Sequence, residues 1–156
     1  MTQTAVSLTT DSRTAIAEAL NQSVAETVVA TMLAQNFHWN VTGMAFGPLH
    51  DLFQRIYEDH FVAQDDLAER IKSLDAQAEG TLSGMLKRSK VKEHEGDATD
   101  KEMIKAMQEA QEILAATLAG TGELAAEHGD TLTEDLCIAR GQTHEKFAWF
   151  LRAHLA

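Results

Sequence analysis

Hydrophobic residues recur at helical spacing along most of the chain. Four long segments have this pattern, at about 13–39, 48–75, 99–129 and 131–154. In the first, apolar positions repeat every four residues from Ile16 to Met32, which predicts one buried stripe on a long helix. Pro48 suits the first turn of the second helix, and Thr99 with Glu102 forms a capping-box pattern at the start of the third. The chain is therefore predicted to be all-α.

Two of the connections between these helices are short, and the middle one is long. Residues 40–47 form the first turn, whereas residues 76–98 form a connector with a short amphipathic helix at about 81–89. Two antiparallel pairs joined by a crossover are typical of the ferritin-like four-helix bundle. The predicted organisation is a short flexible lead-in over 1–12 and one ferritin-like bundle domain over 13–156. The predicted buried sides include Phe61 in the second helix and Leu132 in the fourth.

Composition mainly excludes functions. The chain has 24 acidic and 13 basic side chains, a formal net charge of −11, which argues against an open basic surface for nucleic acid. The single cysteine, Cys137, cannot form an intrachain disulfide and is expected to be an inert buried residue. Without a secretory-signal pattern or a long uncharged apolar run, the protein is expected to be soluble and cytoplasmic, with no membrane partner.

Metal-binding residue types recur across the first two helices at His38, His50, Asp65 and Glu69. Asp65 and Glu69, four residues apart, lie on one helical face and could grip the same cation. His50 and Asp65 are separated by about 22 Å along one helix, so they cannot share a metal within one chain. If all four are ligands, two histidines come from one subunit and two carboxylates from an antiparallel neighbour. The alternative is a solvated carboxylate face and histidines packed against the core.

The usual intrachain di-iron centre of a ferritin-like bundle is built from Glu-x-x-His pairs. None of the 7 histidines has a glutamate three residues before it, so a site between subunits is the better prediction. The other five histidines have no spacing that demands a metal and are interpreted as surface or interface residues: His60, His94, His128, His144 and His154.

The chain resembles the Dps family (DNA-binding protein from starved cells). The similar segments are HWNVTG at 38–43, FGPLH at 46–50, DDLAER at 65–70 and HEKFAWFLRAHL at 144–155. The intervals of 12, 15 and 4 residues between the four metal-binding residues match the family's pattern. The resemblance implies a twelve-subunit shell, with iron oxidised between two-fold-related subunits. His38 and His50 would be imidazole ligands, and Asp65 and Glu69 carboxylate ligands, for Fe(II) and then Fe(III).

This resemblance also implies a reaction. The protein would be a ferroxidase-type oxidoreductase that uses hydrogen peroxide in preference to dioxygen, stores the ferric mineral and protects the cell against oxidative stress. Many relatives have a carboxylate where this chain has Gln54, so the second iron is expected to bind more weakly. Trp39 is interpreted either as an electron donor beside His38 or as a core residue, and Trp149 as a packing residue.

The acidic stretch around residue 130 has two interpretations. Asp130, Glu134 and Asp135 could line a three-fold pore through which iron enters, because a ring of carboxylates attracts cations. Alternatively, they are only the acidic start of a helix, where such residues are favoured.

DNA binding and compaction is the alternative function, because the family is named for it. Neither terminus has a lysine-rich tail, and the nearest basic residues, Lys87, Arg88, Lys90 and Lys92, are followed by acidic ones, so DNA binding is doubtful. A third interpretation is a structural shell with a vestigial site, which the complete set of four ligand types disfavours.

Overall fold

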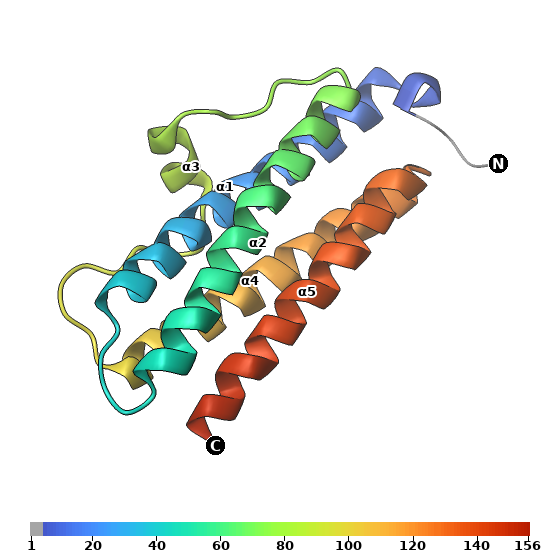
Figure 1. The fold of residues 1–156 in the computed structure, drawn as a ribbon. Coiled ribbons are helices and arrows are strands. Elements are labelled where there is room, and N and C mark those ends of the chain that lie inside the picture. The colour runs from blue at the N-terminus through green and yellow to red at the C-terminus, as the bar shows by residue number, and fades with distance from the viewer. Residues whose placement is uncertain (1–4) are drawn as a thin grey trace.

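The computed structural model describes residues 5–156 as a helical bundle (Figure 1). Its elements are a 3-10 turn η1 (Ala5–Ser7) and the helices α1 (Thr10–Asn40), α2 (Phe46–Ser73), α3 (Leu82–Arg88), α4 (Asp100–Glu127) and α5 (Thr131–Leu155). No strand occurs among these residues, which confirms the all-α prediction, and residues 1–4 of the predicted lead-in lie outside them. No helix within 5–156 has the length and apolar character needed to cross a membrane.

Side-chain caps explain where the helices begin. In the predicted capping box, Glu102 N donates to Thr99 Oγ1 at 3.2 Å, and Thr99 N donates to Glu102 Oε2 at 2.8 Å. Thr9 Oγ1 accepts from Ser12 N at 3.1 Å, and α1 therefore begins at Thr10, a few residues before the predicted start.

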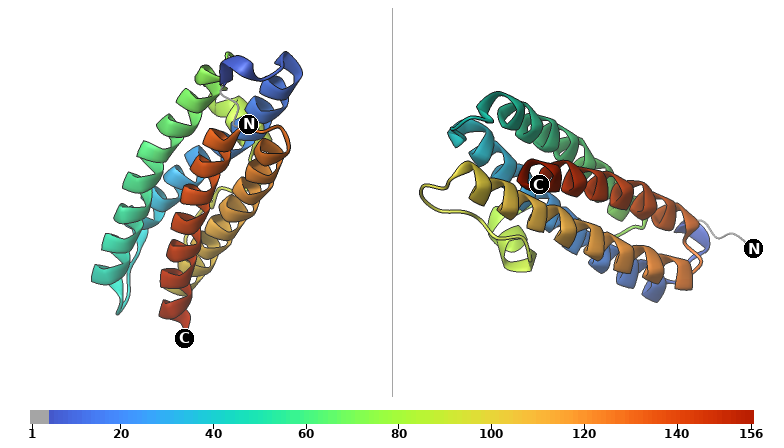
Figure 2. Two further views of the ribbon diagram at one scale, coloured as in Figure 1. Left: turned by 90° about the vertical axis from the view of Figure 1, so that its right-hand side faces the viewer. Right: turned by 90° about the horizontal axis from the view of Figure 1, so that it is seen from below.

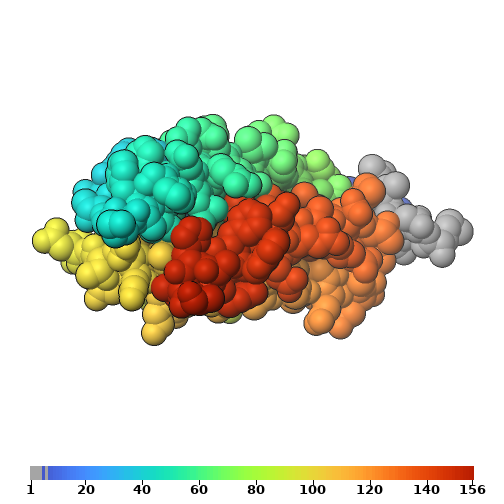
Figure 3. Space-filling model, turned by 60° about the horizontal axis from the view of Figure 1, so that its bottom comes forward, coloured from blue at the N-terminus to red at the C-terminus, as the bar shows by residue number. Residues whose placement is uncertain are grey.

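The long helices form two antiparallel pairs, α1 with α2 and α4 with α5, which pack against each other (Figures 1 and 2). The connector between the pairs carries α3, which lies against α1 (Figure 1). On one face of the molecule, α5 lies between α2 and α4 (Figure 3). This arrangement confirms the predicted four-helix bundle with a short additional helix in its crossover.

Two glycines allow α4 and α5 to lie close together. Gly129, in the turn between them, has a φ of 77°, a left-handed conformation that glycine adopts without steric cost. Within α4, a Cβ added at Gly122 would lie only 3.2 Å from the Cβ of Cys137. A larger residue at position 122 would press against Cys137, and a larger residue at position 129 would strain the turn.

The hydrophobic core consists of two clusters of buried side chains. One includes Phe37, Phe53 and Phe147. The other includes Leu20 and Leu67. Both clusters draw on α1 and α2 and on the α4–α5 pair, so apolar burial joins the two pairs near both ends of the bundle.

Two histidines lie between these clusters. His60 and His144 are fully buried, so their interpretation as surface or interface residues is wrong. Along α2, His60 falls between Ile56 of the first cluster and Leu67 of the second. The bundle thus contains a polar layer in its middle, where the two rings find hydrogen-bond partners.

Some residues predicted to be buried are exposed, namely Met32 at 48%, Phe61 at 66% and Leu132 at 54%. For α1 the reason is the helical period. A four-residue repeat advances by about 40° per step on a helix of 3.6 residues per turn, so Met32 lies about 160° around the helix from Ile16. The stripe therefore starts in the core at Ile16 and leaves it by Met32.

Candidate metal centre

His38 and His50 are brought together by the turn between α1 and α2. His38 lies near the end of α1, and His50 lies near the start of α2. The Nδ1 atom of each ring is 2.8 Å from the backbone carbonyl oxygen of the other residue. The rings stack, with centroids 3.7 Å apart and planes inclined by 20°. One half of the predicted site is therefore assembled within a single subunit.

These reciprocal hydrogen bonds determine the tautomer of the neutral rings. A carbonyl oxygen can only accept, so each Nδ1 carries the hydrogen and donates it. Each Nε2 atom then keeps its lone pair. Metal-binding histidines usually have this arrangement, with the second ring nitrogen donating to a carbonyl or carboxylate oxygen. Both Nε2 lone pairs are thus left available for a cation.

Two aromatic rings flank the histidine pair. The Phe46 ring stacks on His50 with centroids 5.2 Å apart, and Tyr57 lies edge-on to His38 at 5.3 Å. Phe46 is visible in the sequence as the first residue of FGPLH. Tyr57 was not recognised as part of the site, although its position two helical turns after His50 on α2 is a usable signal. Both rings restrict rotation of the imidazoles.

The two carboxylates lie elsewhere on the subunit. Asp65 and Glu69 are exposed, one turn apart in the second half of α2. Within residues 5–156, no group of three or more His, Cys, Asp or Glu side chains is placed to hold a metal ion. A single subunit therefore presents a histidine half and a carboxylate half, about 22 Å apart along α2.

Gln54 lies one turn after His50 on α2. Its Nε2 atom donates to Glu58 Oε1 at 2.8 Å. Since a carboxylate cannot donate, the NH2 group of Gln54 faces Glu58, and its carbonyl oxygen is left for another partner.

Both tryptophans are largely exposed. Trp39, next to His38, has 63% of its surface exposed, so its interpretation as a core residue is wrong for the single subunit. Trp149 is 56% exposed and contacts Phe150 at a centroid distance of 4.9 Å. The expected packing role of Trp149 is thus limited to a contact at the surface of α5.

The structure removes Asp130 from the predicted pore. Asp130 is fully buried, and its Oδ1 atom accepts from the Arg70 guanidinium at 2.9 Å and from Thr133 N at 3.1 Å. A carboxylate used for a helix cap and an internal ion pair cannot face a pore. Glu134, which is partly exposed, and Asp135, which is exposed, remain as pore predictions in the first turns of α5.

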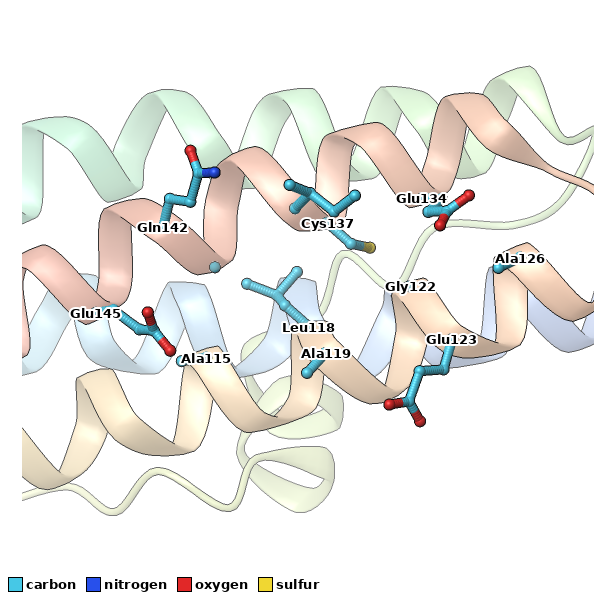
Figure 4. A pocket seen from close by; sticks show the side chains of 12 residues that line it. Ala115, Leu118, Ala119, Gly122, Glu123, Ala126, Glu134, Cys137, Gln142 and Glu145 are labelled. Atoms are coloured by element: carbon cyan, nitrogen blue, oxygen red, sulfur yellow. The ribbon is translucent and has the colours of Figure 1, made fainter.

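Cys137 lies in a groove of about 370 Å³ between α4 and α5, near Glu134 and opposite Gly122 (Figure 4). The residue is free and 3% exposed, which confirms its predicted burial. Burial, with a smaller contribution from Asp130, raises the pKa of the thiol to about 12. The thiolate needed for redox or alkylation chemistry is therefore scarce at neutral pH.

The basic segment at residues 87–92, at the end of α3 and just after it, carries charge of both signs together with its neighbours. Arg88 forms an ion pair with Glu18 of α1. Lys87, Lys90 and Lys92 are exposed, and acidic side chains directly follow them at 93–97.

Comparison with known proteins agrees with the fold. A family model described as a ferritin-like domain matches residues 17–156. General stress protein 20U of Bacillus subtilis (strain 168) is 34% identical over 138 residues, 88% of this chain and 95% of that protein. The DNA protection during starvation protein of Brevibacillus brevis is 34% identical over 140 residues, 90% of this chain and 94% of that protein.

Solved structures show the same likeness. The Dps protein of Vibrio cholerae O1, described as a member of a broad superfamily of ferritin-like diiron-carboxylate proteins, has a TM-score of 0.93 at 33% identity, covering 100% of this chain and 98% of that chain. Dps from Thermosynechococcus elongatus has a TM-score of 0.91 at 33% identity, covering 94% of each.

The fold and the extent of these matches define a ferritin-like protein. Within that superfamily, the chain belongs to the Dps family. Membership supports iron storage and protection against oxidative stress as its general role.

Proposed function

We propose that this protein is a mini-ferritin that oxidises Fe(II) with hydrogen peroxide at a centre shared by two subunits. The ferric product is stored inside a shell of twelve subunits, and the cell is thereby protected from peroxide and free iron together. The observation that carries the proposal is the stacked His38–His50 pair, in which both Nδ1–H groups are engaged and neither Nε2 atom has a hydrogen-bond partner among residues 5–156.

A two-fold interface would complete the centre. Rotation of about 100° per residue places His50 and Asp65 within about 60° of each other around α2, on one face of the helix. If α2 packs antiparallel to its copy, the histidine end of one meets the carboxylate end of the other, twice per interface. Exposed Trp39 and Phe61, at 63% and 66%, lie beside the two halves and support burial of this face.

The donor set suits the substrate. Two imidazole nitrogens with two carboxylates bind Fe(II) and accommodate the harder Fe(III) product. Two ferrous ions supply both electrons that peroxide needs: H2O2 + 2 Fe(II) + 2 H⁺ gives 2 Fe(III) + 2 H2O. Paired oxidation avoids the one-electron step that releases a hydroxyl radical. Gln54 adds no charge, so the second Fe(II) would bind more weakly than the first.

DNA compaction remains the alternative, because relatives are named for DNA protection. The net charge of −11 and the Arg88–Glu18 ion pair argue against it. A gel shift at low salt tests it, since phosphate-based binding would be tight and salt-sensitive.

Peroxide pulses to protein loaded anaerobically with Fe(II) test the reaction. Fast ferric absorbance is expected in the wild type and is lost in His50→Ala and in Asp65→Ala, while Asp66→Ala is the matched control. Equal, slow traces in all four proteins would overturn the proposed centre.

Mixed assembly tests the sharing of the centre between subunits. Shells reassembled from equal amounts of His50→Ala and Asp65→Ala subunits should recover about one quarter of the wild-type activity. About half of the interfaces then join the two kinds of subunit, and in each of these one of the two centres combines an intact histidine half with an intact carboxylate half. A centre built within one chain would recover none.

A further inference from the structure

Five polar side chains form a closed ring of hydrogen bonds in the middle of the bundle. Arg140 NH1 and NH2 lie 3.1 and 2.7 Å from the two carboxylate oxygens of Asp59. His60 Nδ1 lies 3.0 Å from Asp59 Oδ2. Gln111 links the two histidines, with Nε2 2.9 Å from His60 Nε2 and Oε1 2.8 Å from His144 Nδ1. His144 Nε2, 3.3 Å from Arg140 NH2, closes the ring.

The chemistry of Arg140 and Asp59 determines the direction of every bond. A guanidinium only donates, and a carboxylate only accepts. His144 must therefore accept at Nε2 and donate from Nδ1 to Gln111 Oε1. The Gln111 amide then donates to His60 Nε2, and His60 donates from Nδ1 to Asp59. In this arrangement both histidines are neutral, and each of the ring's hydrogen bonds joins one donor to one acceptor, while the buried Nε of Arg140 has no partner among residues 5–156.

The ring joins the two helical pairs. It takes two members from α2, one from α4 and two from α5. Its histidines and Gln111 are fully buried, while Asp59 and Arg140 reach the surface with 28% and 11% of their side chains exposed. A second ionic link, Arg70 to Asp130, connects α2 with the start of α5.

We propose that this ring is an acid-sensitive lock between α2 and α5. Proton uptake by either buried histidine breaks the ring and releases residues 140–155 of α5 from α2. The Arg70–Asp130 pair holds the other end of α5 in place.

The ring cannot accept a proton without placing two donors face to face. A proton on His144 Nε2 faces the Arg140 guanidinium, and a proton on His60 Nε2 faces the Gln111 amide. If the Gln111 amide is rotated by about 180°, its oxygen can accept from His60 Nε2, but its NH2 group then faces His144. Two donors then meet at His144 instead of at His60. The charge of the ring also changes from zero to +1 in the interior, where an uncompensated charge is costly.

The charged groups around the rings favour the neutral state. Burial is the largest cause that lowers the pKa of both His60 and His144, and Arg140 of α5 lowers both pKa values further. Asp59 of α2 opposes this shift in both rings, and His60 lowers the pKa of His144 further. The α4 helix contributes the uncharged Gln111, and no α1 side chain is among the main causes of either shift. Both folded-state pKa values lie below the ordinary 6.5, so the unfolded chain binds more protons below that pH, and stability falls there.

Hydrogen exchange at the histidine Cε1 position tests the neutral ring in the wild-type protein. Measured by mass spectrometry from about pH 8 to 4.5, it reports the pKa and accessibility of each ring. His60 and His144 should exchange far more slowly than exposed His154, and both should titrate below the ordinary histidine pKa of 6.5. Titration of both rings at or above that value would overturn the proposal.

Amide exchange on the same protein locates the opening. As the pH falls from about 7 to 5, residues 140–155 should lose protection, after correction for intrinsic rates, while α1 keeps it. Uniform loss along all helices, or no loss in 140–155, would overturn the lock.

A pair of variants tests the linkage. The double variant His60→Gln/His144→Gln removes both titrating rings but keeps polar groups in their place, and His154→Gln is the control. In the wild type and the control, the equilibrium constant for unfolding should increase as the pH is lowered below 6.5. The increase should be up to about tenfold per pH unit for each proton that the unfolded chain takes up. Equal pH dependence in all three proteins contradicts the proposal. If the double variant does not fold, the two exchange measurements decide.

Discussion

Replacing Asp130 should destabilise the subunit without acting on iron entry. The side chain is fully buried, caps α5 through Thr133 N, and pairs with Arg70 of α2. Asp130→Ala removes the cap and the counter-charge together. Asp130→Asn keeps a capping oxygen and loses only the charge. The two variants therefore separate the contributions of this carboxylate.

The structure sets the size of each effect. Loss of an N-cap costs about 1 kcal/mol. Loss of one partner from a buried ion pair costs about 3–5 kcal/mol, and the lower end applies because 14% of the Arg70 side chain is exposed and can be partly rehydrated. Asp130→Ala should thus cost about 4 kcal/mol. Asp130→Asn should cost about 3 kcal/mol, because Arg70 loses its counter-charge while the capping oxygen is kept.

Urea unfolding followed by circular dichroism measures these costs. All variants are compared at one subunit concentration, because assembly makes apparent stability depend on concentration. Asp135→Ala, at an exposed position five residues further along α5, is the control and should change the unfolding free energy by no more than about 0.5 kcal/mol.

A cost for Asp130→Ala no larger than that of the Asp135→Ala control would refute the assignment of a buried cap and ion pair. The rate of iron uptake provides a second test of whether Asp130 faces a pore. If Asp130→Asn slows Fe(II) entry as much as Asp135→Asn while leaving stability unchanged, the carboxylate faces a pore and its placement here is wrong.

Three further predictions follow from local geometry. Cys137, with its pKa raised to about 12, should react with iodoacetamide only after unfolding; rapid labelling of the native protein would contradict its burial. A Cβ added at Gly120 would meet no atom of a neighbouring element within 4 Å among the described residues, so Gly120→Ala should stabilise α4 by up to about 1 kcal/mol. Gly122→Ala should gain less or destabilise the subunit, and equal gains for both variants in urea unfolding would refute the close approach of α4 and α5. Gln54→Glu should tighten the second Fe(II) in anaerobic titrations; two equally tight irons in the wild type would overturn that reasoning.

Helix order and most helix ends were predictable because their causes are local. A capping box and a 3.6-residue period each act within a few turns, so Thr99 and Glu102 identify the start of α4 from sequence alone. The failures have a physical cause too. A stripe counted every four residues drifts around the helix, and it carried Met32 to the surface.

The site was only partly predictable for a different reason. The spacing of His38, His50, Asp65 and Glu69 shows that one chain cannot bring all four together, but not which backbone groups orient the imidazoles. Asp130 illustrates the same limit. An acidic residue before a helix is compatible with a cap, an ion pair or a pore, and Arg70, sixty residues away, decides among them.

The hydrophobic pattern gives the least information about buried polar residues. A polar residue type predicts exposure, and only hydrogen-bond partners elsewhere in the fold make its burial possible. The ring at Asp59 and His60 depends on α4 and α5, which no α2 pattern reveals. Its position nevertheless fits the proposed centre. At about 100° per residue, His50, Asp65 and Glu69 span an arc of about 100° around α2, and Asp59 and His60 lie on the opposite side. Because the ring anchors the middle of α2 on the side opposite the proposed ligands, it fixes the direction in which both His50 and the Asp65–Glu69 pair face.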